Sequence, residues 1–450
     1  MTSFLWGAAT SGHQIEGNNV HNDWWQWEAQ GFVEGGVRSG IATDHWKRFR
    51  EDLKLASDLG LNSYRFSIEW SRIEPKEGTW NREALDWYRE LINECEKQKL
   101  LPMATLHHFT IPQWFSETGG FAAHDAKDKF TRFVKHIAGH LGSRIPLWCT
   151  LNEPMVYVVG AYLGKFLPPG RFLPKRASAA CRNLLKAHVS AYEMIHRQIS
   201  KREGPWKNRP LEVGIAHNLL DFHPDRPWHP IEAWTARIFH RFFNLSWLDA
   251  LAGRKQHFGV LGIIPYPKQV KEAIGRVTAD FIGVNYYTKA YVQWHPLAKT
   301  ENSPSEIPLG LTFCRRKEPA SDLGWAIHPK GLAKMIRVAS AYKLPLYITE
   351  NGIADRKDHM RKDFLKKHLF ELAKLIHEGI DIRGYYYWSL LDNFEWIKGF
   401  WPRFGLYAVE YQSLDRTVRK SALYYKQIIE AHRQNNLSLP PQLACFKKIF

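Results

Sequence analysis

Eight short apolar runs recur along this 450-residue chain, and this repetition restricts its possible folds more than any other feature. Each run is flanked by residues that favour turns, and the segments between the runs have helical periodicity. Short apolar runs of this kind are typical of buried β-strands. We expect strands at residues 4–10, 61–68, 101–106, 145–152, 211–218, 281–287, 344–351 and 382–391.

The segment from Asp44 to Leu59 shows the helical periodicity most clearly. Spacings of three and four residues place its apolar side chains on one face of a helix. Asp44 precedes the first of them and is a residue type that commonly caps a helix, so we expect it to be the N-cap. The predicted apolar face consists of Trp46, Phe49, Leu53, Ala56 and Leu59.

Strands that alternate with helices along one unbroken chain favour a closed (β/α)8 barrel, the TIM barrel, over two open sheets. No linker rich in Pro, Gly or Ser divides the sequence, so we expect residues 1–450 to form a single catalytic domain. Catalytic groups in such barrels lie at the carboxyl ends of the strands and in the loops after them. Six long segments fit neither pattern and follow predicted strands: 11–43, 107–124, 163–177, 219–230, 288–326 and 392–420.

The composition is that of a globular protein with a basic surface. Hydrophobic residues at 44% and charged residues at 24% exclude a disordered or collagen-like chain. The formal net charge of +17 would suit nucleic acid or a membrane surface. However, the basic residues are scattered, and clusters such as 315–316 and 366–367 are only two residues long. We therefore expect no nucleic-acid partner, and a basic nucleic-acid or membrane-surface protein is the less favoured alternative.

The cysteines and the two ends of the chain predict a reduced, cytoplasmic protein. Five cysteines at positions 95, 149, 181, 314 and 445 lack the spacing of metal sites, and we expect reduced thiols. The N-terminus has no charged region followed by a long apolar segment, and no window is both long enough and uncharged enough to span a membrane. The last residues, L-A-C-F-K-K-I-F at 443–450, are compatible with weak contact at a membrane surface.

Two glutamates stand at the ends of predicted strands. The run L-W-C-T-L-N-E-P at 147–154 ends on Glu153, because Pro154 cannot extend a strand and biases the residue before it toward extended geometry. Y-I-T-E-N-G at 347–352 repeats the arrangement with Glu350. The two side chains would face each other across the barrel mouth. A carboxylate pair flanking a cleft is the machinery of glycoside hydrolysis, although an acidic chain segment can also form such a pair by chance.

Motifs along nearly the whole chain resemble those of the glycoside hydrolase family 1 β-glycosidases. T-L-N-E-P at 150–154 and I-T-E-N-G at 348–352 resemble the two signatures of that family. The further matching motifs, in family order, are Q-I-E-G at 14–17, Y-R-F-S-I-E-W-S-R-I at 64–73, V-N-Y-Y-T at 284–288, W-S-L-L-D-N-F-E-W at 388–396 and R-F-G-L at 403–406.

The resemblance implies a retaining exo-β-glycosidase that hydrolyses β-D-glucosides, with β-galactosides and β-fucosides as further substrates. The expected partners are small β-glycosides or oligosaccharides, and no metal or organic cofactor is expected. Alternatives on the same scaffold are a β-mannosidase, a transglycosylase and a carbohydrate-binding pseudoenzyme. The sequence predicts no oligomeric state.

The resemblance also implies roles for individual residues. Glu153 corresponds to the acid/base and Glu350 to the nucleophile, and Asn152 is placed for the sugar 2-hydroxyl. Arg65 and Tyr287 correspond to the pair that holds the nucleophile. The remaining implied sugar-binding residues are Gln14, His108, Phe109, Asn285, Trp388, Glu395, Trp396 and Phe404.

Elementary electrostatics supports the division between the two glutamates. Arg65 beside Glu350 should keep that carboxyl ionised, whereas Glu153 lacks its own cation and should hold its proton to higher pH. A retaining mechanism requires the two carboxyl groups to lie about 5 Å apart. The structural alternatives are that Arg65 is only a buried ion-pair partner and that His108 is a core histidine.

Two positions bear on the preferred sugar. Many family members have His-Trp where this chain has His108-Phe109, so an indole donor near the sugar 3-hydroxyl is absent. The phosphosugar branch usually lacks the Glu-Trp pair that is present here as Glu395-Trp396. The Glu395 carboxylate would repel a 6-phosphate on the sugar. We therefore do not expect this chain to be a 6-phospho-β-glycosidase. Trp388 and Trp396 alone could equally be core residues.

Overall fold

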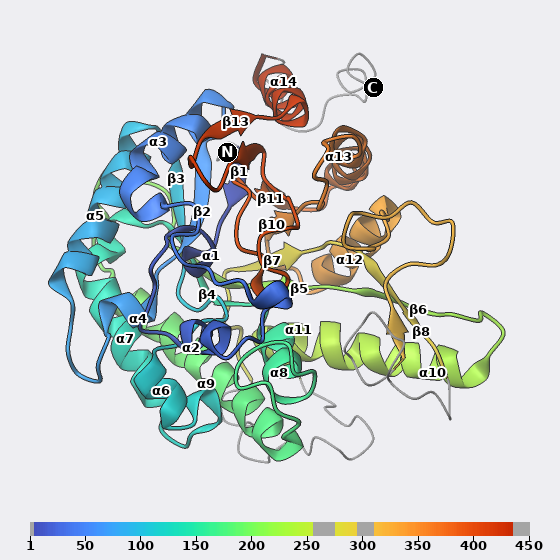
Figure 1. The fold of residues 1–450 in the computed structure, drawn as a ribbon, viewed down its shortest axis with the longest axis horizontal. Coiled ribbons are helices and arrows are strands. Elements are labelled where there is room, and N and C mark those ends of the chain that lie inside the picture. Colours follow the sequence, from blue (N-terminus) through green and yellow to red (C-terminus); the bar gives the residue numbers. More distant parts are fainter. Residues whose placement is uncertain (1–3, 255–274, 295–309, 435–450) are drawn as a thin grey trace.

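Eight parallel strands close into a barrel in the computed structural model, which describes residues 4–254, 275–294 and 310–434. The strands meet in the order β1-β2-β3-β4-β5-β7-β10-β11, and β11 pairs with β1 to close the ring (Figure 1). Each of the eight predicted runs contains one of them, which confirms the (β/α)8 prediction. Their bounds are β1 Leu5–Ala9, β2 Ser63–Ser67, β3 Leu101–Thr105, β4 Leu147–Asn152, β5 Glu212–Asn218, β7 Phe281–Asn285, β10 Leu346–Asn351 and β11 Ile382–Trp388.

Helices surround the strands on all sides of the barrel (Figure 1). The α-helices are α1 Gly12–Ile15, α2 Asp23–Ala29, α3 His45–Asp58, α4 Trp70–Ile73, α5 Arg82–Lys97, α6 Gln113–Glu117, α7 Ala126–Leu141, α8 Pro154–Tyr162, α9 Pro174–Gln198, α10 Pro230–Phe239, α11 Ser246–Leu251, α12 Pro329–Ser340, α13 Arg361–His377 and α14 Lys420–Gln434. Shorter helical turns are η1 Glu34–Gly36, η2 Gly120–Ala122, η3 Gly142–Arg144, the π-helical η4 His240–Leu245 and η7 Trp396–Lys398.

Alternation along the strands separates two apolar cores. In β3, Leu101 and Met103 belong to the cluster that fills the barrel, whereas Ala104 belongs to the larger cluster between strands and helices. In β4, Cys149 lies inside and Trp148 outside. Because successive side chains of a strand point to opposite faces, and both faces of the sheet are covered, the strands are buried along nearly their whole length.

Helix α3 confirms the predicted apolar face and the N-cap position of Asp44, but not a side-chain cap. Phe49, Leu53 and Ala56 are buried. Asp44 occupies the N-cap position, yet its side chain makes no capping hydrogen bond. Its backbone is left-handed, with φ 52° and ψ 33°, whereas a side-chain cap requires extended geometry. The backbone oxygen of Asp44 nevertheless accepts hydrogen bonds from the amides of Lys47 and Arg48.

The long segments predicted as irregular contain small sheets of their own. Strands β6 (Asp221–Pro224), β8 (Lys289–Val292) and β9 (Leu311–Thr312) form one sheet beside the barrel. Strands β12 (Tyr407–Val409) and β13 (Arg416–Val418) form a second. Such short strands give too few residues for a periodic pattern, so the sequence did not reveal them.

Two further predictions concern the ends and the thiols. Within the described ranges, no helix is long and apolar enough to cross a membrane. The proposed membrane-contacting residues 443–450 lie outside the described residues, as does Cys445. The other four cysteines are free thiols, as expected.

Candidate active site

Glu153 stands directly after β4, in an uncommon backbone conformation. The strand ends at Asn152 and Pro154 begins α8, as the sequence predicts. The expected extended geometry of Glu153 is wrong, because its backbone is left-handed with φ 46° and ψ 57°. Its amide donates a hydrogen bond of 2.7 Å to the oxygen of Ala216 on β5, and this tertiary contact overrides the local preference. A non-glycine residue held in this region is often part of a functional site.

Two amides hold the Glu153 carboxyl. Asn285 Nδ2 lies 2.8 Å and Asn218 Nδ2 lies 3.1 Å from the same oxygen, Oε1. Burial, followed by the charge of Glu350, raises the pKa of Glu153 to about 8. Asn218 was missed in the sequence, although it ends a predicted strand just as Asn152 and Glu153 do.

Glu350 lies on β10 and has charged and phenolic partners. Arg65 Nη1 is 2.6 Å from Oε1, and the Tyr287 hydroxyl donates a hydrogen bond of 2.6 Å to Oε2. Burial raises the pKa of Glu350 above its ordinary value, and the charge of Arg65 opposes that rise. The expectation that Arg65 favours ionisation therefore has the correct sign, but desolvation is the larger effect.

Arg65 and Asn152 connect the Glu350 carboxyl to His108. Arg65 is fully buried, and its Nη2 donates to Asn152 Oδ1 at 2.7 Å. This contact fixes the Asn152 amide so that its nitrogen, 3.1 Å away, donates to His108 Nε2. Burial, and then the charge of Arg65, holds the pKa of His108 well below its usual value. The imidazole is therefore neutral and carries its proton on Nδ1.

Aromatic rings line the region next to His108. Trp388 and Trp396 stack near its ring, with centroid distances of 5.9 and 6.1 Å. Phe109 contacts Trp396 edge-on at 5.3 Å. On the other side, Phe404 lies 6.1 Å from the ring of Tyr287. All four rings are buried.

Three polar atoms of this region are buried without a hydrogen-bond partner among the described residues. They are Gln14 Oε1, His108 Nδ1 and Glu395 Oε2. The nitrogen of Gln14 donates to Asn393 Oδ1 at 3.0 Å and to the oxygen of Phe394 at 2.8 Å, so its oxygen is left as an acceptor. Burial, followed by the charges of the other two glutamates, raises the pKa of Glu395 to about 8. Unpaired buried polar atoms require a reason, and a polar ligand is one.

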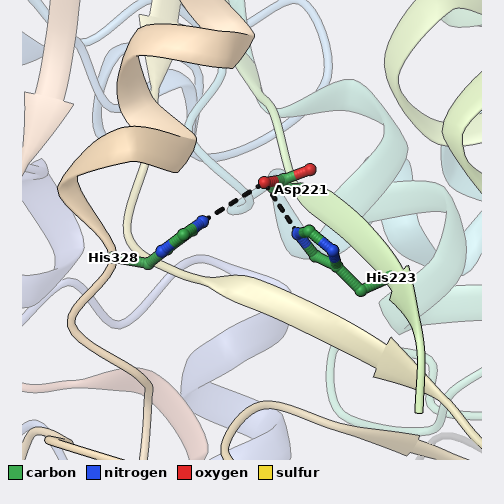
Figure 2. Close-up of side chains that lie close together, drawn as sticks. All are labelled: Asp221, His223 and His328. Carbon is green, nitrogen blue, oxygen red and sulfur yellow. Dashed lines mark ion pairs between the residues drawn. The ribbon is translucent and has the colours of Figure 1, made fainter. Parts of the chain in front are cut away.

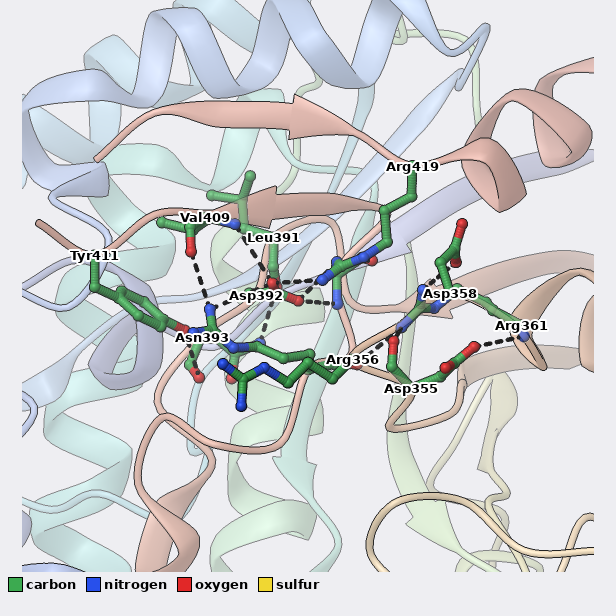
Figure 3. A network of polar contacts seen from close by, with 12 residues as sticks. Asp355, Arg356, Asp358, Arg361, Leu391, Asp392, Asn393, Val409, Tyr411 and Arg419 are labelled. Atoms are coloured by element: carbon green, nitrogen blue, oxygen red, sulfur yellow. Dashed lines mark hydrogen bonds and ion pairs between the residues drawn. The ribbon is translucent and has the colours of Figure 1, made fainter. Parts of the chain in front are cut away.

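The polar network of Figure 3 holds the segment after β11, and this segment also carries Glu395 and Trp396. Both oxygens of Asp392 accept hydrogen bonds of 2.8 Å from the Arg419 guanidinium, and Oδ1 also accepts from the amide of Gly405. Figure 3 shows a neighbouring group, in which the amide of Arg361 donates to Asp355. The segment is thus held by buried charge pairs rather than by regular secondary structure.

None of these residues belongs to a group of metal-ligand type. Within the part of the chain that the structure describes, the one such group consists of Asp221, His223 and His328.

Residues 1–434 match the family model described as "Glycosyl hydrolase family 1". The chain belongs to glycosyl hydrolase family 1. One relative is beta-glucosidase A of Thermotoga maritima, 32% identical over 95% of this chain and 97% of the relative. A beta-galactosidase of Pyrococcus woesei is 30% identical over 95% of this chain and 96% of the relative. A solved beta-glycosidase from Pyrococcus horikoshii has a TM-score of 0.81 and 38% identity, covering 98% of each chain.

This family 1 protein is therefore a glycoside hydrolase of the β-glycosidase class. Eleven of the thirteen site residues predicted from the sequence are joined to one another by hydrogen bonds or ring contacts. Gln14 donates instead to Asn393 and Phe394, just before Glu395.

Proposed function

We propose that the family 1 protein is a retaining exo-β-glycosidase of β-D-glucosides, with Glu350 as the nucleophile and Glu153 as the acid/base. The observation that carries this proposal is the difference between the two carboxyl environments. Glu350 has a guanidinium at 2.6 Å, whereas the hydrogen bonds to the Glu153 carboxyl come from two neutral amides. A cation favours the ionised form that attacks, and its absence favours the protonated form that donates.

The proposed reaction has two displacements. In the first, a Glu350 oxygen bonds to the anomeric carbon while the bond to the leaving oxygen breaks, and that oxygen takes the proton of Glu153. The glycosyl ester removes the charge of Glu350, so the pKa of Glu153 falls and its carboxylate can accept a proton. In the second, water attacks the anomeric carbon, gives its proton to Glu153 and releases Glu350.

The unpaired polar atoms support a sugar as the occupant. Gln14 Oε1 is an acceptor and His108 Nδ1–H is a donor, and Glu395 Oε2 lies in the same region. Sugar hydroxyl groups both donate and accept, so one ring can satisfy all three. The rings of Trp388 and Trp396 provide apolar surface for the faces of the sugar.

A panel of chromogenic β-glycosides tests this proposal. We expect turnover of the β-glucoside with a β-configured product by NMR, and lower rates for the β-galactoside, β-fucoside and β-mannoside. The 6-phospho-β-glucoside should be the poorest substrate. An α-configured first product, or a preference for the phosphorylated sugar, would contradict the proposal.

Replacing Glu395 should change the choice between sugars. In Glu395→Gln we expect the rate on β-glucosides to fall more than the rate on β-fucosides, which lack the 6-hydroxyl. The amide is uncharged and its nitrogen only donates, so its hydrogen bonds with the 4- and 6-hydroxyls should be weaker than those of two carboxylate oxygens. The measurement is kcat/KM for both substrates in both proteins, and equal losses would contradict the assignment.

The pH dependence of kcat/KM should be bell-shaped. Activity should fall as the pH rises through about 8, because Glu153 must be protonated to act as the acid and its pKa is about 8. It should also fall at acid pH, as Glu350 takes up a proton at a pH above the usual range of a glutamate.

Glu395 also has a pKa raised to about 8, so the alkaline limb needs a control. The limb should persist in Glu395→Gln and disappear in Glu153→Ala assayed with an activated aryl glycoside. If the alkaline limb disappears only in Glu395→Gln, it reports the ionisation of Glu395, and its assignment to Glu153 is wrong.

A further inference from the structure

A second cluster of chemically active side chains lies where the β6–β8–β9 sheet meets helix α12. Asp221 and His223 belong to β6, and His328 directly precedes α12. Both histidines direct Nε2 at the same carboxyl oxygen, Asp221 Oδ2, from two sides (Figure 2). The distances are 2.8 Å for His223 and 3.4 Å for His328.

The contact between His223 and Asp221 is close but poorly aligned for a hydrogen bond. His223 Nε2 is at contact distance from the carboxyl oxygen, yet it is buried and has no hydrogen-bond partner of acceptable geometry among the described residues. A proton on that nitrogen would therefore not point along a normal hydrogen bond. A deprotonated His223 Nε2 beside the Asp221 carboxylate oxygen would offer two electron pairs to one cation.

We propose that Asp221, His223 and His328 bind a divalent transition-metal ion of the zinc type. Two imidazoles and a carboxylate form a common three-ligand set for Zn²⁺, which takes water as its fourth ligand. The three ligand atoms lie within 4.8 Å of one another. An ion about 2.0–2.2 Å from each of them would separate the ligands by roughly 3.3 Å in a tetrahedron, so modest side-chain movement closes the site.

The surroundings of the three side chains leave a path for an ion to enter and fix the orientation of the Asp221 carboxylate. The side chains of His223 and His328 are 35% and 23% exposed, whereas Asp221 is buried. Lys334 pairs with the other oxygen, Oδ1, at 2.6 Å. Its side chain is more than half exposed, so solvent screens its repulsion of a bound cation. Metal-ligating carboxylates commonly have such a second partner that fixes their orientation.

The ion would fasten a segment on one side of the active site. Asp221 lies three residues after Asn218, which holds Glu153. The backbone oxygen of His328 accepts a hydrogen bond of 2.9 Å from Tyr286, the residue before Tyr287. The ion therefore joins two segments that follow barrel strands. It stabilises the folded protein, and the catalytic chemistry is left to the glutamates.

Zinc titration of the chelator-treated, full-length protein tests the proposal. We expect one tight site by calorimetry and a rise of the melting temperature of about 3 °C or more with excess Zn²⁺. His328→Ala and the milder His223→Gln should each lose both effects. Hydrolysis by the chelator-treated enzyme should persist well below its melting temperature.

Other groups can bind zinc, and the controls separate them. His136 and His140 lie one turn apart on α7 with ring centroids 4.4 Å apart, so His136→Ala/His140→Ala is the matched control and should keep the tight site. Co²⁺ provides a second readout in the wild-type protein, because visible bands without a thiolate charge-transfer band indicate nitrogen and oxygen ligands. Absence of a tight site, a site lost only in the control variant, or a thiolate spectrum would overturn the proposal.

Discussion

Replacing Glu350 with glycine is expected to reduce turnover of a β-glucoside by about 10⁴-fold or more, on the scale of other essential covalent catalysts. The variant removes the group that attacks the anomeric carbon and leaves a small space between Arg65 and Tyr287, which both contact the carboxyl in the native protein. Azide or formate can fill this space beside the guanidinium. The anion then attacks from the side that Glu350 occupied, and one displacement gives an α-configured product.

The configuration of that product is the decisive measurement. Proton NMR of the azide reaction should show an α-glycosyl azide, and the rate should rise with azide concentration. Because Arg65 stays in place, an anion is expected to restore activity better than a neutral nucleophile of similar size. Full activity without an added anion would show that Glu350 is not the nucleophile.

Glu153→Ala should cause a loss that depends on the leaving group. Substrates with acidic phenols need little protonation, so they should still form the glycosyl-enzyme, whereas alkyl glycosides should lose several powers of ten in rate. The second step should become slow because no base activates water. Azide needs no base, so it should release the ester and give a β-glycosyl azide through a second inversion.

The two glutamate variants are controls for each other. Opposite configurations of the azide products require that one residue bonds to the sugar and the other moves a proton. Azide products of the same configuration from both variants, or an equal loss on all leaving groups in Glu153→Ala, would show that the two roles are assigned wrongly.

The sequence predicted those parts of the molecule that follow from local patterning. The eight barrel strands are fully buried runs bounded by turns, and Glu153 and Glu350 could be found because each ends such a run. Asn218 obeys the same rule and was overlooked. Asp44 is the N-cap as predicted, but its side chain does not cap the helix, because residue type does not determine backbone conformation. The left-handed backbone of Glu153 depends on a hydrogen bond to β5 that no local pattern contains.

Contacts between distant segments were beyond the reach of sequence patterns. His328 meets His223 only because a helix start packs beside a short strand, and neither segment has a metal-site spacing. The degree of burial that raises the pKa of Glu395 to about 8 is likewise a property of the assembled barrel. The carboxyl groups can be located from the sequence, whereas the fold determines how readily each one ionises.

The contacts of Arg65 make catalytic activity a reporter of barrel closure. This residue belongs to β2, yet it donates hydrogen bonds to Thr105 on β3, Asn152 on β4 and Glu350 on β10. The first three strands are neighbours, whereas β10 is reached only from across the ring. A fragment that ends before β10 therefore lacks Glu350, which is both the proposed nucleophile and the partner of the guanidinium. When such a fragment is mixed with one that carries the remaining strands, the recovered rate of hydrolysis would measure the fraction of molecules in which the two fragments have joined.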